Sequence, residues 1–272
     1  MIIGGIKMVV NDIIITSLET INAFDITTGA YLFTLDELQD ATIEQTQDSQ
    51  EITGKQGRKL ATLKRNKAVS ISGTNGILSG GLLELQTGSK FSDGNVEVMW
   101  TDYLTVNNNT ATTSWKAIGA AGSEIKELYL KDENGNLTVK KEQAADSPSE
   151  GKFTYNPGTK VITFNTSEIA DGTEIFVAYK RKISASQLVN DSGKYSEKCM
   201  LYVDAIGEDK CAHIYRVQFF IPKADFSGEF SIELGGDQVT HEFSADALSG
   251  ACGTHGQFFT YTVFGANTAD VQ

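Results

Sequence analysis

The chain has 272 residues, a formal net charge of −12 at neutral pH and three prolines. This length is enough for a substantial core, in one large domain or in one domain with an insertion. The acidic balance disfavours tight nucleic-acid binding, since phosphate contacts need lysine and arginine, and the lack of an apolar run of about 18 residues excludes a membrane-spanning helix.

Residues 1–7 lack the basic start, long apolar run and cleavage site of a secretory signal. We therefore expect the protein to be made and kept in a cytoplasm. Gly, Asn, Thr and Ser are plentiful between short alternating runs of residues, which favours a mainly β fold with one or two short helices.

Residues 41–52 form a strand-length segment that is polar on both faces. Alternate side chains of a strand point to opposite faces, and here even the face that begins at Ile43 continues with Gln45 and Gln47. All charges in 36–51 are acidic and all charges in 52–73 are basic, with the turn-like sequence 53–57 after the acidic run. This pattern predicts a long hairpin with an acidic arm and a basic arm.

Two interpretations of this hairpin stay open. Isolated two-stranded ribbons are marginally stable in water and exposed edges invite pairing with other chains, so copies of the chain could complete the ribbon, with opposite charges setting the register. Alternatively, it is an ordinary surface hairpin whose arms neutralise each other. If copies meet there, the candidate subunit-contact residues are Glu44 and Asp48 on the acidic arm and Lys64, Arg65 and Lys67 on the basic arm.

A short helix is predicted over 77–88, after a strand at 69–72. Apolar residues recur at 77, 78, 82 and 85, Thr74 or Asn75 could cap the start, and Gly88 could end the helix. Glycines inside this helix indicate close backbone packing, because each costs roughly 1 kcal/mol relative to alanine.

These segments carry a family resemblance. The runs Ala-Thr-Ile-Glu-Gln-Thr from Ala41, Ile-Thr-Gly-Lys from Ile52, Gly-Arg-Lys from Gly57 and Lys-Ala-Val-Ser-Ile-Ser-Gly-Thr-Asn-Gly from Lys67 resemble the major tail (tail tube) proteins of tailed bacteriophages, particularly those of the prophage type from Gram-positive hosts. The resemblance is strongest over about 36–90, and a weaker one covers 219–230.

The resemblance implies a β-sandwich or barrel-like tail tube fold, in a structural virion protein that forms hexameric rings stacked into a tube. Long hairpins would form an inter-subunit barrel, through which phage DNA would pass during ejection without specific binding. The implied partners are copies of the chain itself, with tape-measure, tail-terminator and baseplate or tail-tip proteins. The implied location is the virion tail, assembled in the host cytoplasm. The resemblance brings no cofactor and no catalytic residue.

Residues 119–181 form a predicted β-rich insertion in a single tail-tube domain over 1–272. Segments 125–130 and 137–141 flank Asn134-Gly135, which is typical of a type I′ hairpin. Segments 152–155 and 161–164 flank a second turn, and another strand is predicted at 174–179. Whether the insertion is a separate lobe or joins the main sheet stays open.

Alternating residues predict further strands in the last third of the chain. The segments 213–221 and 230–234 are expected to be joined by a short turn at 222–228, and 257–264 carries aromatic residues on both faces. Such a strand would be buried on both sides or packed against a neighbouring subunit. The tail 265–272 is expected to be loose or to bind an adjacent ring.

Cysteine and histidine spacing offers one possible metal pattern. Cys211-Ala-His213 and Cys252-Gly-Thr-His255 could be zinc-ligand pairs, with Cys199 as a fifth candidate. Buried thiols and a solvent-facing histidine are the alternative, and we expect no metal site. The odd cysteine count argues against a disulfide framework.

No enzyme motif is found: the chain has neither a Gly-x-Ser-x-Gly elbow nor a phosphate-binding loop, so catalysis is not expected. Two alternatives to the tube subunit remain. One is a monomeric or small-oligomer β-sandwich adhesin or glycan-binding module, with Trp100, Tyr103 and Trp115 in an aromatic groove. The other is an enzyme whose catalytic carboxylates have no recognisable pattern.

Overall fold

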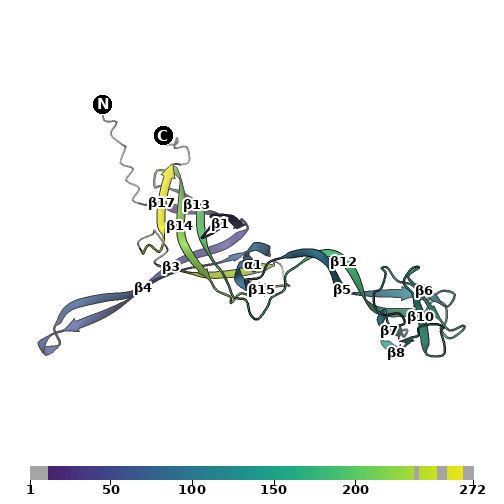
Figure 1. Ribbon diagram of the computed structural model, residues 1–272. Coiled ribbons are helices and arrows are strands. Elements are labelled where there is room, and N and C mark those ends of the chain that lie inside the picture. The colour runs from purple at the N-terminus through teal and green to yellow at the C-terminus, as the bar shows by residue number, and fades with distance from the viewer. Residues whose placement is uncertain (1–11, 236–238, 250–255, 266–272) are drawn as a thin grey trace. The chain divides into compact units, whose positions relative to one another are not determined.

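The computed structural model describes residues 12–235, 239–249 and 256–265 (Figure 1). The chain divides into two compact units: unit 1 comprises Met1–Lys90 and Leu188–Gln272, and unit 2 comprises Phe91–Gln187. Strands dominate both units, and the described residues contain one α-helix. The predicted mainly β class is confirmed. The predicted insertion at 119–181 falls inside unit 2.

One antiparallel sheet builds unit 1. Its strand order is β2 (Tyr31–Leu35), β1 (Ile14–Asp25), β13 (Lys198–Glu208), β14 (Ile214–Phe226), β16 (Thr240–Ala247), β4 (Lys59–Asn75) and β3 (Leu38–Thr53). Two short strands join beside this path: β15 (Ile232–Glu233) pairs with β16, and β17 (Thr260–Gly265) pairs with β14. Over the described residues the sheet ends at β2 and β3 and does not close into a barrel.

The core of unit 1 lies where alternate residues of these strands face helix α1 (Gly80–Thr87). Its fully buried side chains include Ile21, Leu35, Ile71, Leu82, Leu201 and Ile221. Gly81 lets the helix approach β2, because a Cβ at this position would lie 2.5 Å from the Cβ of Phe33. The predicted close packing at a helix glycine is therefore confirmed.

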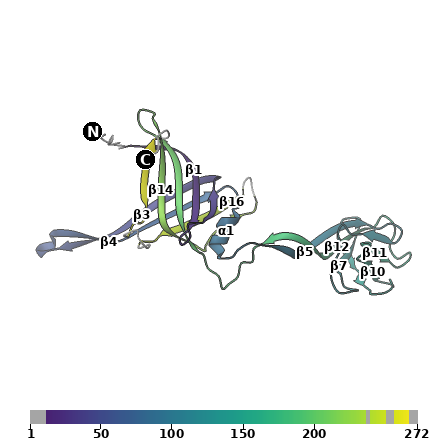
Figure 2. The ribbon, with the colours of Figure 1, turned by 45° about the horizontal axis from the view of Figure 1, so that its top comes forward.

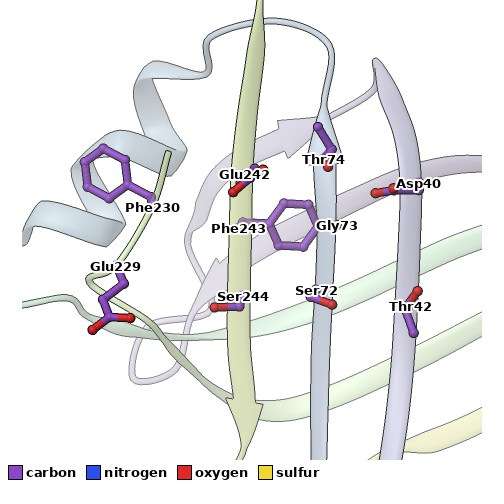
Figure 3. Close-up of a pocket in the computed structure, with 10 residues that line it drawn as sticks. All are labelled: Asp40, Thr42, Ser72, Gly73, Thr74, Glu229, Phe230, Glu242, Phe243 and Ser244. Carbon is purple, nitrogen blue, oxygen red and sulfur yellow. The ribbon is translucent and has the colours of Figure 1, made fainter. Parts of the chain in front are cut away.

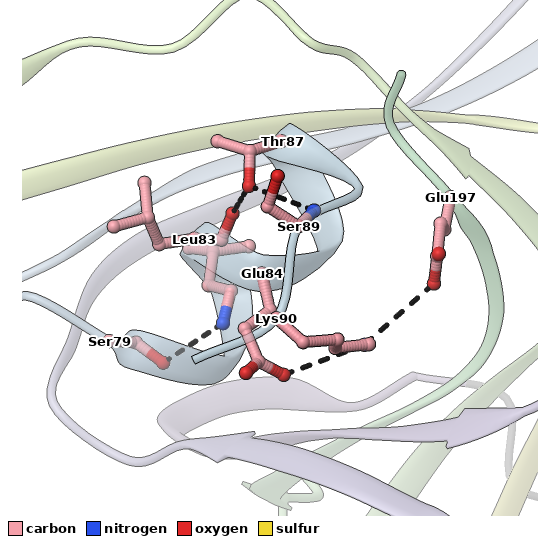
Figure 4. A network of polar contacts seen from close by, with 8 residues as sticks. Ser79, Leu83, Glu84, Thr87, Ser89, Lys90 and Glu197 are labelled. Atoms are coloured by element: carbon pink, nitrogen blue, oxygen red, sulfur yellow. Dashed lines mark hydrogen bonds and ion pairs between the residues drawn. The ribbon is translucent and has the colours of Figure 1, made fainter. Parts of the chain in front are cut away.

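The predicted helix end is right and the predicted start is wrong. Gly88 ends α1 in the left-handed conformation, whereas Ser79 is the N-cap and its Oγ accepts from the Leu82 N–H at 3.3 Å (Figure 4). Asn75 instead belongs to β4, and its Nδ2 donates to the Ile77 carbonyl at 2.8 Å. This hydrogen bond stabilises a loop at 76–79, where the first turn of the helix was predicted. The same close-up shows Lys90 between two carboxylates of unit 1.

Strand β14 continues to Phe226 and so occupies most of the turn predicted at 222–228. Its first half pairs with β17 as far as Phe220, and its last residues pair with β16 from Ala224. Pro222 lies between the two partners and within the register shift between β13 and β14, and proline is tolerated at such a bulge. Only β15 remains of the strand predicted at 230–234, and the predicted tail lies almost wholly outside the described residues.

Unit 2 is a sandwich of two four-stranded sheets. One has the order β5 (Ser92–Thr105), β12 (Glu174–Gln187), β7 (Ile125–Lys131) and β8 (Leu137–Lys140). The other has the order β6 (Thr110–Thr112), β11 (Val161–Phe164), β10 (Lys152–Asn156) and β9 (Glu142–Gln143). Both sheets contribute to one core, which includes Leu128, Phe153, Ile162, Ile175 and Tyr179.

Both hairpins predicted in this region are confirmed. The connection 132–136 is longer than a type I′ turn, since Gly135 has positive φ and Asn134 does not. Asp132 organises it instead: its Oδ1 accepts from the backbone N–H groups of Asn134 and Asn136. The Asp132 carboxylate therefore stabilises a longer turn than the predicted two-residue one.

Candidate assembly surface

Strands β3 and β4 continue beyond the rest of the sheet as a two-stranded ribbon (Figures 1 and 2). We call residues 44–53 and 59–68 the ribbon, and every residue in these two segments is exposed. The strands pair from Glu44 opposite Ser70 to Thr53 opposite Lys59. The hairpin predicted from the charge pattern is therefore confirmed.

The base of the hairpin differs from the prediction. Ala41 and Ile43 are partly buried against the unit 1 core, and Ile43 lies opposite the fully buried Ile71. The prediction that both faces avoid a core is wrong there, because neighbouring strands β4 and β16 extend the core under this end of β3. It holds from Glu44 onward.

The predicted contact residues occupy different parts of this hairpin. Glu44 lies opposite Ser70, Asp48 opposite Arg65, and Lys64 opposite Ser49. A bulge at Asn66 interrupts the pairing within the ribbon, and Asn66 Nδ2 donates to Asp48 Oδ2 at 2.8 Å. The Lys67 ammonium lies 5.7 Å from the ring centroid of Phe258. The structure thus places Asp48 opposite Arg65 within one chain, and the role of these residues between chains stays a prediction.

Apolar residues on the ribbon are a feature that the charge pattern does not predict. Ile52 and Leu63 are each 47% exposed and Leu60 is 58% exposed. Gln50 pairs with Leu63 and Ile52 pairs with Ala61, so Ile52 and Leu63 lie on the same face of the ribbon. The run Leu-Ala-Thr-Leu in the basic arm was the signal that could have revealed this face.

The sheet face of β16, β4 and β3 that points away from the core carries carboxylates and hydroxyls. Side chains of neighbouring strands meet there in three rows, which we call the acidic face: Glu242–Thr74–Asp40, Ser244–Ser72–Thr42 and Asp246–Ser70–Glu44. Figure 3 shows the first two rows on the three strands. The four corners of the grid are carboxylates.

Two hollows follow this face. One has a volume of about 340 Å³, the other about 500 Å³, and both are lined by Ser72 and Ser244. Glu229 and Phe230 also line the first, and Asp225 the second. The residues that line the two hollows include no lysine or arginine. Asp225 pairs with Lys198 at 3.2 Å, whereas no ion pair is found for the four corner carboxylates among the described residues. The acidic face therefore presents net negative charge, which would repel a phosphate backbone.

Gly73 holds the strands of this face close together. A Cβ at this position would lie 2.5 Å from the Asp40 carbonyl oxygen and 2.8 Å from Cζ of Phe243 (Figure 3). The ring of Phe243 fills that space from β16 and is buried. The close spacing of the three strands that form the acidic face therefore requires a glycine at position 73 of the middle strand, β4.

The three aromatic residues of the alternative groove do not form one groove. The guanidinium carbon of Arg181 lies 5.0 Å from the ring centroid of Trp100 and 3.8 Å from that of Trp115. Tyr103 lies an odd number of residues from Trp100 on β5, so it is on the opposite face of the strand, where it packs against Phe176 at 5.5 Å.

A buried carboxylate holds Trp100 and the neighbouring loop in place. Asp102 accepts from Trp100 Nε1 at 3.0 Å, from the Tyr179 hydroxyl at 2.7 Å and from the Ser114 N–H at 2.8 Å. Burial raises the pKa of Asp102, but these hydrogen bonds outweigh it and keep the pKa below its usual value. Burial and the bond to Asp102 raise the pKa of Tyr179. These hydrogen bonds therefore connect β5 to β12 and to the loop that contains Ser114.

The possible zinc ligands are also dispersed. Cys252 and His255 lie outside the described residues. Cys199 is buried in the unit 1 core, and burial raises the pKa of its thiol to about 12. Cys211 and His213 lie together at the turn between β13 and β14.

Comparison with known proteins identifies the family. None of the helices in the described ranges is both long and apolar enough to cross a membrane. A search of curated proteins returns no match. Residues 13–260 match the model of the YomU/Tube protein family, a name that indicates a phage tube-like structural protein. Because the match covers most of the chain and reaches from β1 to β17, the protein belongs to the YomU/Tube family.

Proposed function

We propose that this chain is the subunit of a phage tail tube, in which hexameric rings of the chain stack around a channel that DNA crosses during ejection. The single observation that carries the proposal is the exposed ribbon, which presents Ile52, Leu60 and Leu63 to solvent. The sixfold ring is the arrangement that the sequence resemblance implies.

The ribbon gains stability from a partner chain. A free two-stranded ribbon is marginally stable, whereas complete burial of one leucine or isoleucine side chain contributes about 1.5–3 kcal/mol. Ile52 and Leu63 are each 47% exposed, so covering them with a neighbouring copy would supply about half of that contribution twice. β3 also ends the sheet, so the backbone groups along its outer edge are available to a strand from another copy.

The charged residues would set the register of this contact. Lys64 and Arg65 lie on opposite faces of the ribbon, since they are adjacent in the strand, while Glu44 lies on the acidic face and Asp48 lies beside the bulge. Lys67 lies next to the bulge, and its ammonium is near the ring of Phe258. Opposite charges across a boundary between copies select one alignment more than they add affinity.

The acidic face suits the wall of the channel. Its carboxylates repel the phosphate backbone, and its serine and threonine hydroxyls keep the surface hydrated. DNA would then slide without binding. In this proposal the chain is not an enzyme and needs no cofactor, and it meets tape-measure, tail-terminator and baseplate or tail-tip proteins in the virion tail.

The test is whether the ribbon is needed for polymerisation. Electron microscopy and analytical ultracentrifugation of the purified full chain should show tubes or stacked rings. The double variant Ile52→Ser/Leu63→Ser should stay monomeric with an unchanged circular dichroism spectrum, because each serine removes apolar surface that only a partner chain would cover. The charge-reversed Arg65→Glu/Lys67→Glu variant should also fold and fail to polymerise.

Matched controls lie in unit 2. Leu137 has the same exposed fraction as Leu63, 47%, so Leu137→Ser should leave tube formation intact. Lys126→Glu/Lys182→Glu changes the net charge by the same amount as the ribbon reversal and should also polymerise. Tubes of normal length from both ribbon variants, or a wild-type chain that stays monomeric, would contradict the proposal. The monomeric outcome would favour the adhesin alternative.

A further inference from the structure

The connection between β13 and β14 has a fixed conformation, and Asp209 organises it. One carboxylate oxygen, Oδ1, accepts from the backbone N–H of Cys211 at 2.8 Å and from that of His213 at 3.0 Å. The backbone N–H of Asp209 donates to the His213 carbonyl at 3.1 Å. Ala212 has a φ of 63°, which reverses the chain between the cysteine and the histidine.

This conformation brings three metal-ligating groups together. The second oxygen of Asp209, Oδ2, lies 2.9 Å from Nδ1 of His213. The Cys211 Sγ is close as well, because the ligand atoms of all three residues lie within 4.8 Å of one another. Zn–S and Zn–N bonds of about 2.3 and 2.1 Å place tetrahedral ligands about 3.3–3.8 Å apart. A small rotation of the side chains would therefore bring the three atoms onto one ion.

The donor set selects the kind of metal. One thiolate sulfur, one imidazole nitrogen and one carboxylate oxygen suit a borderline transition-metal ion such as Zn²⁺, and they do not suit Ca²⁺ or Mg²⁺, which take oxygen ligands. Three protein ligands leave a fourth tetrahedral position for water or for a group from another molecule.

The three residues are accessible from solvent. Cys211 is exposed and the His213 side chain is 69% exposed. The nearby ammonium of Lys210 pairs with Asp12 at 2.5 Å, which offsets its repulsion of a cation.

We propose that Asp209, Cys211 and His213 form a binding site for Zn²⁺ or a similar transition-metal ion. On binding, the Cys211 thiol releases its proton to solvent, His213 binds through Nδ1 as the neutral tautomer with its proton on Nε2, and the ion replaces the contact between Asp209 Oδ2 and His213 Nδ1. The site is independent of tube formation. Its fourth position faces solvent in the isolated chain.

Titration of the purified, reduced full chain with Co²⁺ tests this proposal, because Co²⁺ is a coloured substitute for Zn²⁺. The wild type should develop a thiolate-to-cobalt charge-transfer band with saturation at one ion per chain, and excess Zn²⁺ should abolish the band. Cys211→Ser should lose the band. His213→Gln and Asp209→Asn should each weaken Co²⁺ binding by more than about tenfold, the loss seen when even a group that orients a ligand is removed.

Two control variants distinguish metal binding at this turn from binding at the second cysteine–histidine pair and from loss of the fold. Cys252→Ser/His255→Ala removes the second pair and should leave the band unchanged. Asp209→Asn retains an oxygen that can accept the two backbone hydrogen bonds of the turn, so a native circular dichroism spectrum is expected for it. A wild type without a thiolate band, a band that survives Cys211→Ser, or a band lost only in the Cys252→Ser/His255→Ala control would overturn the proposal.

Discussion

At the residue scale, His241 is the buried titratable side chain with the clearest consequence. Its Nε2 donates to Gln86 Oε1 at 2.8 Å, which ties β16 to α1. Its Nδ1 has no hydrogen-bond partner among the described residues, and neither does Oδ1 of Asn75, the residue opposite it on β4. Burial lowers the pKa of His241, so the folded protein holds this histidine in its neutral form.

This burial predicts that unit 1 is less stable in mild acid. The unfolded chain takes up a proton at His241 near pH 6.5 and the folded chain does so only at lower pH. The contribution of neutral His241 to the free energy of unfolding is therefore fully present above pH 6.5. It is lost as the pH falls from 6.5 toward the lowered pKa of the folded state. The slope approaches about 1.4 kcal/mol per pH unit. Urea unfolding between pH 7.5 and 5 measures it.

The exposed His213 gives the comparison for this prediction. His241→Gln should reduce the slope, while His213→Gln should keep most of it, because the His213 side chain is 69% exposed and lies outside the core that buries His241. Equal slopes in wild type and His241→Gln would show that another group controls the acid response.

At the element scale, the packing of β16 on β4 depends on Gly73. Gly73→Ala should destabilise unit 1 by about 1–3 kcal/mol, the usual cost of forcing an extra carbon into a packed core. Its Cβ would meet the backbone of Asp40 as well as the ring of Phe243, so a side-chain rotation would not relieve the clash. Chemical denaturation of the full chain measures the loss.

Gly94 is the matched control for this substitution. It is a strand glycine in β5 whose added Cβ would have no atom within 4 Å. Gly94→Ala should therefore leave stability unchanged or raise it slightly, because alanine has less freedom in the unfolded chain. A Gly73→Ala variant as stable as Gly94→Ala would mean that the strands separate easily.

At the scale of the whole molecule, unit 2 has the features of an independently folding domain. It has its own core across two sheets, and its first and last strands pair along their full length, from Ser92 opposite Gln187 to Thr105 opposite Glu174. The ends of unit 2 therefore lie side by side. Removing unit 2 would therefore leave the two cut ends of unit 1 close together, so the strands of unit 1 would not need to rearrange.

We predict that residues 91–187 expressed alone will unfold in one cooperative thermal transition. A chain that joins Lys90 to Leu188 through a short glycine-serine linker should keep the spectrum and stability of unit 1. If the excised unit is unfolded while the full chain is folded, its core depends on unit 1 and the division of the chain into two domains is wrong.

Local patterns determined much of what the sequence predicts correctly. The mainly β class follows from alternation, the end of α1 from Gly88, and the hairpins of unit 2 from short turns whose residues are neighbours in the chain. The hairpin of β3 and β4 follows from two charged runs on either side of a turn. Each of these features depends on interactions between residues close in sequence.

Only the tertiary structure decided how distant segments meet. β14 continues past Pro222 because its partner changes there from β17 to β16, and the acidic face exists because β16, more than 150 residues beyond β4, supplies its third column. The opposite faces of Trp100 and Tyr103, and the contact of Ala41 and Ile43 with the core, also depend on which strands are neighbours. Pairing between distant strands is set by the register that buries the most apolar surface, and a single sequence read locally does not contain that register.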